Sequence, residues 1–263
     1  MGFKFYRVNA LLLKYWFITK NKLDRIFDMI YWPVIQILIW GFIVIFVEDI
    51  SESNVKSWLL GAVIMWTFLW KASQDLAVYI LEDHWSRSLY NVFSTPLQNS
   101  EIIVSVLIFS FLRGLATLII TVPLTWILYS YNFFTIDIFY LVIFAILLVL
   151  FGWVLGLIVA ALVYTFGQRI QVLAWSVSVL IQPFSCVFYP LSSLPKWAQY
   201  IAFYIPTTHV FESMRALVNG QPINMLNISI AFITSIALLI ITTWLFVKSI
   251  GKAKQKGLFT RYD

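Results

Sequence analysis

The sequence predicts an all-α integral membrane protein with six transmembrane helices. Of its 263 residues, 61% are hydrophobic and only 11% are charged, whereas a soluble domain carries about 25% charged residues. The mean hydropathy is +0.87, and long apolar runs recur along the chain. We therefore expect a single membrane domain over residues 1–263, with no separate soluble catalytic domain.

A helix needs roughly 20 apolar residues to cross about 30 Å of hydrocarbon. Six runs meet this requirement, near residues 30–47, 58–80, 101–129, 137–163, 171–189 and 226–247. No cleavable signal sequence precedes the first run, so we expect that run to remain as a membrane anchor.

Lysine and arginine predict the orientation, because cytoplasmic segments of membrane proteins carry an excess of both. The net charge of +6 is concentrated in the two tails, which argues for membrane topology and against a nucleic-acid partner. The basic residues of the tails are Lys4, Arg7, Lys14, Lys20, Lys22, Arg25, Lys248, Lys252, Lys254, Lys256 and Arg261. An even number of spans places both termini on one side, which the charges predict to be the cytoplasm.

The first predicted element is an amphipathic helix within residues 1–28. Lys4, Arg7 and Lys14 fall near one helical face, while Trp16 and Phe17 lie among the apolar residues of the rest. This pattern favours a helix in the membrane interface with its lysines directed toward lipid phosphates. A solvated basic leader is the alternative.

The polar segment after the second span predicts a short helix over residues 82–95. Trp85, Leu89 and Phe93 recur at helical spacing, which predicts an apolar stripe against the membrane. Pro96 disfavours helix at the preceding residue, and Asn99 or Ser100 could cap the third span. The polar residues Glu82, Asp83, Arg87 and Asn91 are expected to face the cytoplasm. That face could fit a partner's groove or remain unpartnered.

The segment 190–220 is broken by prolines before the last span. Pro190, Pro195 and Pro206 leave an apolar piece of ten residues, KWAQYIAFYI, which as a helix reaches about half of a bilayer. We expect two short helices that dip into the external leaflet as an external gate. A hairpin that lies on the external surface is the alternative.

Several polar residues lie within the predicted spans, where ionisable groups usually have a function. Lys71 and Asp75 are four residues apart and can neutralise each other on one helical face, and a structural pair is favoured over a contact with substrate. Arg113 lies deep in the third span and needs a partner or a cavity. The residues that could line a pathway are Gln74, Asp75, Arg113, Ser178 and Gln182. They could equally hold helices together.

The fourth span carries small residues at four-residue spacing, namely Gly152, Gly156 and Ala160. Such a face allows helices to approach closely, and we expect it to serve packing within the subunit in preference to a dimer contact.

Phosphate-binding and metal-binding patterns are missing from the sequence. There is no G-x-x-x-x-G-K-[ST] motif, and the two histidines are far apart. We therefore expect a protein that is not an enzyme and binds no cofactor itself.

Two stretches carry a resemblance to a known family. Residues 89–101, LYNVFSTPLQNSE, resemble an internal L-x-x-x-x-x-T-P-L-x-x-x-E segment of the ABC-2 type permeases. Residues 188–220 are similar to that family's signature before the last span. These permeases are the transmembrane subunits of prokaryotic ABC exporters, and the resemblance covers essentially the whole chain.

The resemblance implies a location in the inner membrane, a homodimer of permeases and a separate ATPase subunit that binds ATP and Mg. Helix 82–95 would be the coupling helix docked on that ATPase, through Glu82, Asp83, Trp85, Arg87, Leu89 and Asn91. The external gate would contain Pro190, Leu191, Pro195, Trp197, Tyr200, Tyr204 and Pro206. The substrate would be a drug, a lipid-linked glycan or a polysaccharide. An ATP-independent channel or secondary carrier is the alternative function.

Overall fold

The computed structural model describes residues 2–48, 55–86 and 88–255, and over these ranges the chain is helical without strands. The long helices are α2 (Leu23–Glu48), α3 (Val55–Trp85), α5 (Asn99–Tyr129), α6 (Ile138–Phe166) and α10 (Met225–Gln255). The shorter helices are α1 (Phe5–Asn21), α4 (Leu89–Ser94), α7 (Leu173–Ile181), α8 (Lys196–Phe203) and α9 (Pro206–Val218). Short 3₁₀ helices are η1 (Phe133–Thr135), η2 (Gly167–Ile170), η3 (Gln182–Phe184) and η4 (Leu191–Ser193).

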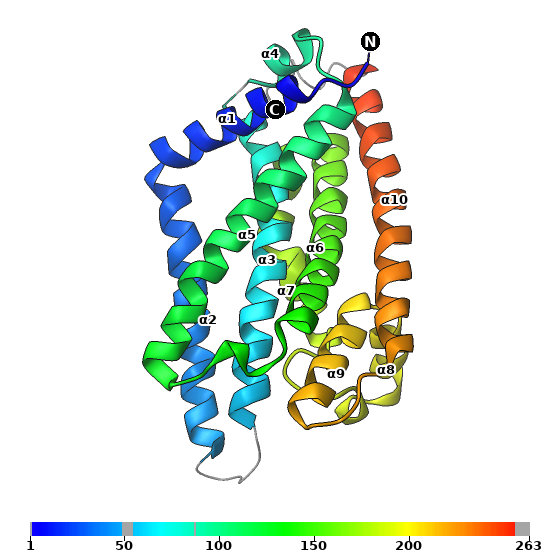
Figure 1. Ribbon diagram of the computed structural model, residues 1–263. Coiled ribbons are helices and arrows are strands. Elements are labelled where there is room, and N and C mark those ends of the chain that lie inside the picture. Colours follow the sequence, from blue (N-terminus) through cyan, green and yellow to red (C-terminus); the bar gives the residue numbers. More distant parts are fainter. Residues whose placement is uncertain (1, 49–54, 87, 256–263) are drawn as a thin grey trace.

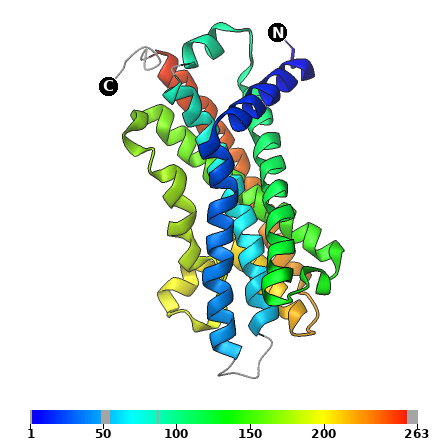
Figure 2. The same ribbon diagram turned by 90° about the vertical axis from the view of Figure 1, so that its left-hand side faces the viewer.

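The long helices run side by side, and the short ones gather at the two ends of this bundle (Figure 1). α1 crosses one end, where α4 and the last turns of α10 also lie; we call this the α1 end. α8 and α9 lie at the opposite end, which we call the hairpin end. Figure 2, which looks onto α2, shows α5 on one side of that helix and α7 on the other.

Among the described residues, four helices are long and apolar enough to span a membrane: α2, α5, α6 and α10. They correspond to the predicted first, third, fourth and sixth spans. The predicted fifth span is shorter than expected, because α7 has nine residues and η3 adds three. These residues rise about 18 Å, well short of the thickness of a bilayer.

α3 coincides with the predicted second span and is the central helix. It has 31 residues, as many as α5, but it is more polar than the four candidate spans. Every residue from Leu59 to Asp83 is buried by the surrounding helices. α3 therefore presents no face to lipid over this stretch, which explains how it can carry Lys71, Gln74 and Asp75.

The glycines of α6 permit its close approach to α3, as the spacing of small residues predicts. A Cβ atom on Gly152 would lie 2.8 Å from the carbonyl oxygen of Leu69, and one on Gly156 would lie 2.8 Å from that of Ser73. Neither distance leaves room for a methyl group. The small residues are thus used for packing within the subunit.

The N-terminal helix ends earlier than predicted. The chain leaves the helical conformation at Lys22, and α2 begins at Leu23. Residues 23–28 belong to the first turns of α2 and not to the predicted interfacial helix. This shift places Arg25 and Asp28 on a long helix of the bundle.

Candidate functional site

The segment between α3 and α5 is not the single helix predicted over residues 82–95. α3 continues through Trp85, and the separate helix α4 has only six residues, Leu89–Ser94. Arg87 lies outside the described residues. The predicted helical stripe is therefore interrupted, because its first member belongs to α3 and its later members to α4.

The two carboxylates at the end of α3 face the protein and not the cytoplasm, which corrects the prediction. Glu82 is 1% exposed and Asp83 is 6% exposed. Arg25 Nη2 lies 2.7 Å from Glu82 Oε2, and Lys22 also pairs with Glu82. Lys14 pairs with Asp83. α1 crosses the end of α3, and buried charges of this kind are stable only when they are paired.

Glu101 joins the start of α5 to the start of α1. Its fully buried carboxylate accepts hydrogen bonds from the backbone amides of Lys4 and Gln98, each at 2.8 Å. The latter bond belongs to a capping box, so the cap of α5 is Gln98, one residue before the predicted position. Arg7 Nη1 lies 3.5 Å from Glu101 and donates to the Pro96 carbonyl at 2.6 Å.

These contacts change the role assigned to the basic residues of the N-terminus. Arg7, Lys14, Lys22 and Arg25 bind carboxylates of the protein and are not directed toward lipid phosphates. The outward side of α1 is largely apolar instead. Its exposed side chains include Phe5, Tyr6, Leu13, Trp16 and Phe17.

The remaining predicted coupling residues lie in different surroundings. The half-buried Trp85 donates from Nε1 to Gln171 Oε1 at 2.9 Å and stacks on Trp175 with ring centroids 6.1 Å apart. Asn91 on α4 is exposed. Among the coupling residues whose side chains the structure describes, Asn91 alone is freely accessible to a partner.

A cluster of four alternating charges lies in the interior of the bundle, and we call it the charge quartet: Asp28, Lys71, Asp75 and Arg113. Lys71 Nζ lies 2.8 Å from Asp28 Oδ2 and 3.7 Å from Asp75 Oδ1. Arg113 Nε lies 3.1 Å from Asp75 Oδ2. Two cations and two anions from α2, α3 and α5 thus neutralise one another.

Neutral groups complete the surroundings of the quartet. Gln74 accepts from Lys71 Nζ at 3.2 Å and donates to Asp28 Oδ1 at 3.4 Å. Arg113 Nη2 donates to the backbone oxygen of Arg25 at 3.1 Å, and Nη1 donates to the Tyr79 hydroxyl. Arg113 therefore meets protein partners through all three nitrogens: Nη1 and Nη2 donate hydrogen bonds, whereas Nε makes only the ion-pair contact with Asp75.

The predicted pathway residues divide into two groups. Gln74, Asp75 and Arg113 come together in or beside the quartet. Ser178 is buried on α7 and Gln182 is half-buried at the start of η3, and no hydrogen bond described joins either side chain to the quartet. Asp28 was missed, because the sequence placed the start of the first span near residue 30. Asp28 lies three residues after Arg25 and four before Trp32. Neither spacing indicates that its carboxylate faces the interior of the bundle.

At the hairpin end, the predicted gate contains two short helices, α8 and α9. The side chains of Trp197 and Tyr200 on α8 and of Tyr204 at its C-cap are exposed, whereas Ala198 and Ala202 are buried. Pro195 is exposed, Pro206 is buried at the start of α9, and Pro190 and Leu191 are half-buried.

A polar latch holds the hairpin to the segment after α7. Glu212 Oε1 accepts from the Leu191 amide at 2.8 Å and from Arg215 Nη1 at 2.7 Å. Arg215 Nη2 donates to the Cys186 carbonyl at 3.0 Å, and its guanidinium lies over the ring of Trp58. Burial lowers the pKa of Arg215, while the Glu212 carboxylate opposes that shift.

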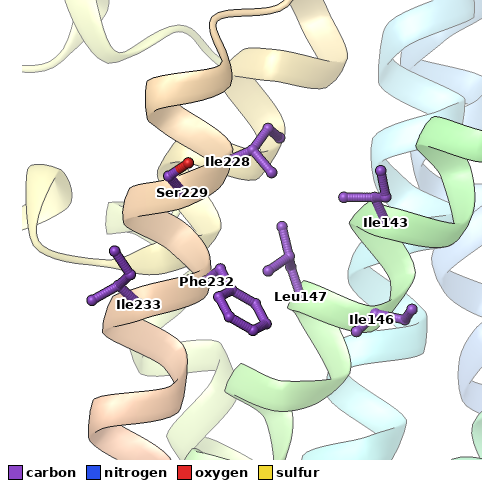
Figure 3. A pocket seen from close by; sticks show the side chains of 7 residues that line it. All are labelled: Ile143, Ile146, Leu147, Ile228, Ser229, Phe232 and Ile233. Carbon is purple, nitrogen blue, oxygen red and sulfur yellow. The ribbon is translucent and has the colours of Figure 1, made fainter.

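An apolar hollow of about 430 Å³ lies between α6 and α10, toward the hairpin end (Figure 3). It is lined by Ile143, Ile146, Leu147, Ile228, Ser229, Phe232 and Ile233. The hydroxyl of Ser229 is already bonded to the Met225 carbonyl. The hollow contains none of the predicted pathway residues, and its walls belong to two candidate membrane spans.

Comparison with known proteins identifies the family. A family described as ABC-2 type transporter matches residues 14–219, which run from α1 to the end of α9. A comparison with curated proteins gives no match. The matched region covers well over half of the chain, and it contains the ion pairs of Glu82 and Asp83, the charge quartet and helices α8 and α9. The chain therefore belongs to the ABC-2 type transporter family and is a multi-pass membrane permease component of an ABC transporter.

Proposed function

We propose that this chain is the permease of an ABC exporter, in which two copies form the translocation pathway and each binds a separate ATPase subunit. ATP and Mg bind to that subunit, and the substrate is amphipathic or hydrophobic: a drug, a lipid-linked glycan or a polysaccharide. Membership of the ABC-2 type transporter family over residues 14–219 is the observation that carries the proposal.

The α1 end faces the cytoplasm of the cell in this proposal, and the protein lies in the inner membrane. The distribution of charge supports this orientation. The α1 end holds Arg7, Lys14, Lys22 and the basic last turn of α10, with Lys252 and Lys254. Cytoplasmic ends of membrane proteins are enriched in such residues.

The ATPase contacts the segment around α4. α4 lies at the α1 end with Asn91, Ser94 and Thr95 exposed, and its neighbours on both sides are anchored. Asp83 holds the end of α3 to α1, and Glu82 holds it to Lys22 and to Arg25 of α2. Glu101 holds the start of α5 to Arg7 of α1. Movement of α4 by the ATPase would therefore be transmitted to α3 and α5, which are anchored on either side of it. The bundle could then change between two conformations by rigid-body movement.

Co-purification with the ATPase tests this proposal. Tagged permease is expected to capture a soluble subunit that contains a P-loop, and the complex should hydrolyse ATP. Asn91→Arg should weaken capture at least tenfold, because it places a bulky charge on the exposed face of α4. Gln221→Arg, an exposed position at the hairpin end, is the matched control and should leave capture unchanged. Solute transport by permease alone in liposomes, without an ATPase, would contradict the proposal and favour a carrier.

A further inference from the structure

Lys71 lies between two carboxylates that belong to different helices. Its Nζ is 2.8 Å from Asp28 on α2 and 3.7 Å from Asp75, which is one turn away on α3 itself. A single ammonium is thus within reach of a partner on another helix and of a partner on its own helix. A small rotation of the lysine chain would suffice to move it from the first to the second.

The two carboxylates are not equivalent. Asp75 is held in the interior by Arg113 of α5 at 3.1 Å, and the side chains of both are at most 5% exposed. The Asp28 side chain is 19% exposed, which makes it the quartet member nearest to the surface. The Asp75–Arg113 pair therefore joins α3 to α5 in the interior, whereas Asp28 reaches Lys71 from the more exposed edge of the quartet.

α2 is also more weakly enclosed than α5. Within their membrane-length segments, 22% of the residues of α2 are buried, against 50% for α5. α2 starts directly after the break at Lys22, where the chain leaves the helical conformation. If the bundle changes shape, α2 is the helix that can separate from α3 with the smaller loss of packing.

We infer that Lys71 is a positioning residue that holds α2 against α3 through Asp28 and passes to Asp75 when α2 moves away. The Lys71 ammonium keeps a carboxylate partner in both states. Arg25 of α2 stays paired with Glu82 of α3, so the movement is a pivot of α2 about this ion pair near its start. The departing Asp28 carries its charge toward the surface. The inference rests on the proposed function, because alternating access requires helices to move against one another.

A charge swap separates this role from simple structural pairing. The double variant Asp28→Lys/Lys71→Asp keeps the quartet neutral and preserves an ion pair between α2 and α3. The carboxylate at position 71 would then face Asp75, a like charge, and could not pass to it. Structural pairing alone predicts that the swapped variant still changes shape on trapping, even if the like charges at positions 71 and 75 lower its stability. The transfer predicts a folded transporter that does not make this change.

The measurement needs no knowledge of the substrate. Nitroxide labels at Ile30→Cys on α2 and Leu112→Cys on α5, both exposed positions, report the distance between these helices by pulsed EPR, with Cys186→Ser removing the native thiol. We compare nucleotide-free and vanadate-trapped complexes with the ATPase. The original quartet should show a longer distance after trapping. The swapped variant should keep the nucleotide-free distance and hydrolyse ATP at least fivefold more slowly.

Either of two results would overturn the inference: an unchanged distance with the original quartet, or an equal increase in the swapped variant. Should the swap fail to fold, Lys71→Met and Lys71→Arg decide the question. The arginine variant can bind either carboxylate and should retain the increase, and the methionine variant should show a long distance even without nucleotide. Matching distances in these two variants would overturn the inference.

Lys20→Met, at an exposed lysine of α1, is the control and should behave as the original quartet does. Failure to capture an ATPase at all would instead contradict the proposed function.

Discussion

At the scale of single residues, Gly156 of α6 shows how little space separates the central helices. A methyl group at this position would lie 2.8 Å from a backbone oxygen of α3 and 2.9 Å from Leu76 Cβ. We expect Gly156→Ala to lower the free energy of unfolding by about 1–3 kcal/mol, the usual cost of overpacking. Thermal unfolding of the detergent-solubilised protein measures the effect.

Gly251 on α10 is the matched control, because nothing lies within 4 Å of a Cβ at that position. Gly251→Ala should leave the midpoint temperature of thermal unfolding unchanged or raise it slightly, since alanine favours helix by about 1 kcal/mol over glycine. Equal midpoints for the two variants would show that α3 and α6 are not in the close contact described.

Some contacts of single residues follow from local spacing along the chain. The small-residue spacing on α6 and the pairing of Lys71 with Asp75 both follow from helical periodicity, and the structure contains both. Asp28 and the burial of Glu82 depend on which helices meet, because each is paired across 43 or more residues of chain. Local spacing carries no information about such pairs.

At the scale of elements, α1 is attached by ion pairs whose removal should loosen it selectively. Lys14→Glu places a second acid beside the buried Asp83 in place of its cation. We expect backbone amides of α1 to exchange with deuterium about fivefold faster, which corresponds to a loss of about 1 kcal/mol for a partly exposed pair. Hydrogen exchange with mass spectrometry measures this, and Lys20→Glu on the exposed side should leave the exchange unchanged. Equal protection in the two variants would rule out a role for the ion pair in docking.

The hairpin is a second element with a defined attachment. Glu212→Ala would leave the Leu191 amide and the Arg215 guanidinium without their shared acceptor, at a cost of about 1–3 kcal/mol. Cys186 is the sole cysteine of the chain and is fully buried beneath the latch. Its reaction with a maleimide should become at least fivefold faster in this variant. Lys196→Ala, at an exposed position on α8, is the control. Unchanged labelling in Glu212→Ala would mean that the hairpin is held by packing alone.

Element boundaries were predicted least well at the α1 end. The regular spacing of Trp85, Leu89 and Phe93 indicated one helix, but α3 extends through Trp85, whose indole bonds to Gln171 and stacks on Trp175. These partners come from a distant part of the chain. Tertiary contacts of this kind override a local helical pattern, and they also determine which face of the end of α3 is buried.

At the scale of the whole molecule, the two ends of the bundle differ in chemistry. Cations of α1 pair with carboxylates of α3 and α5 at one end, and an exposed aromatic face on α8 marks the other. The sequence predicted this polarity from the distribution of lysine and arginine, because charge segregation is a property of composition along the chain. The shortness of α7 could not be predicted in this way, since an apolar run contains no signal of where its helix stops.

The polarity gives a direct test of orientation. In a Cys186→Ser background, Asn91→Cys on α4 and Tyr200→Cys on α8 place thiols at exposed positions on opposite ends. If the α1 end is cytoplasmic, an impermeant maleimide added to intact cells should label only position 200. The same reagent added to inside-out vesicles that contain the permease without its ATPase should label only position 91. The reverse pattern would invert the proposed orientation, and with it the surface available to a cytoplasmic ATPase. Labelling of both positions from one side would contradict a bundle whose ends lie on opposite faces of the membrane.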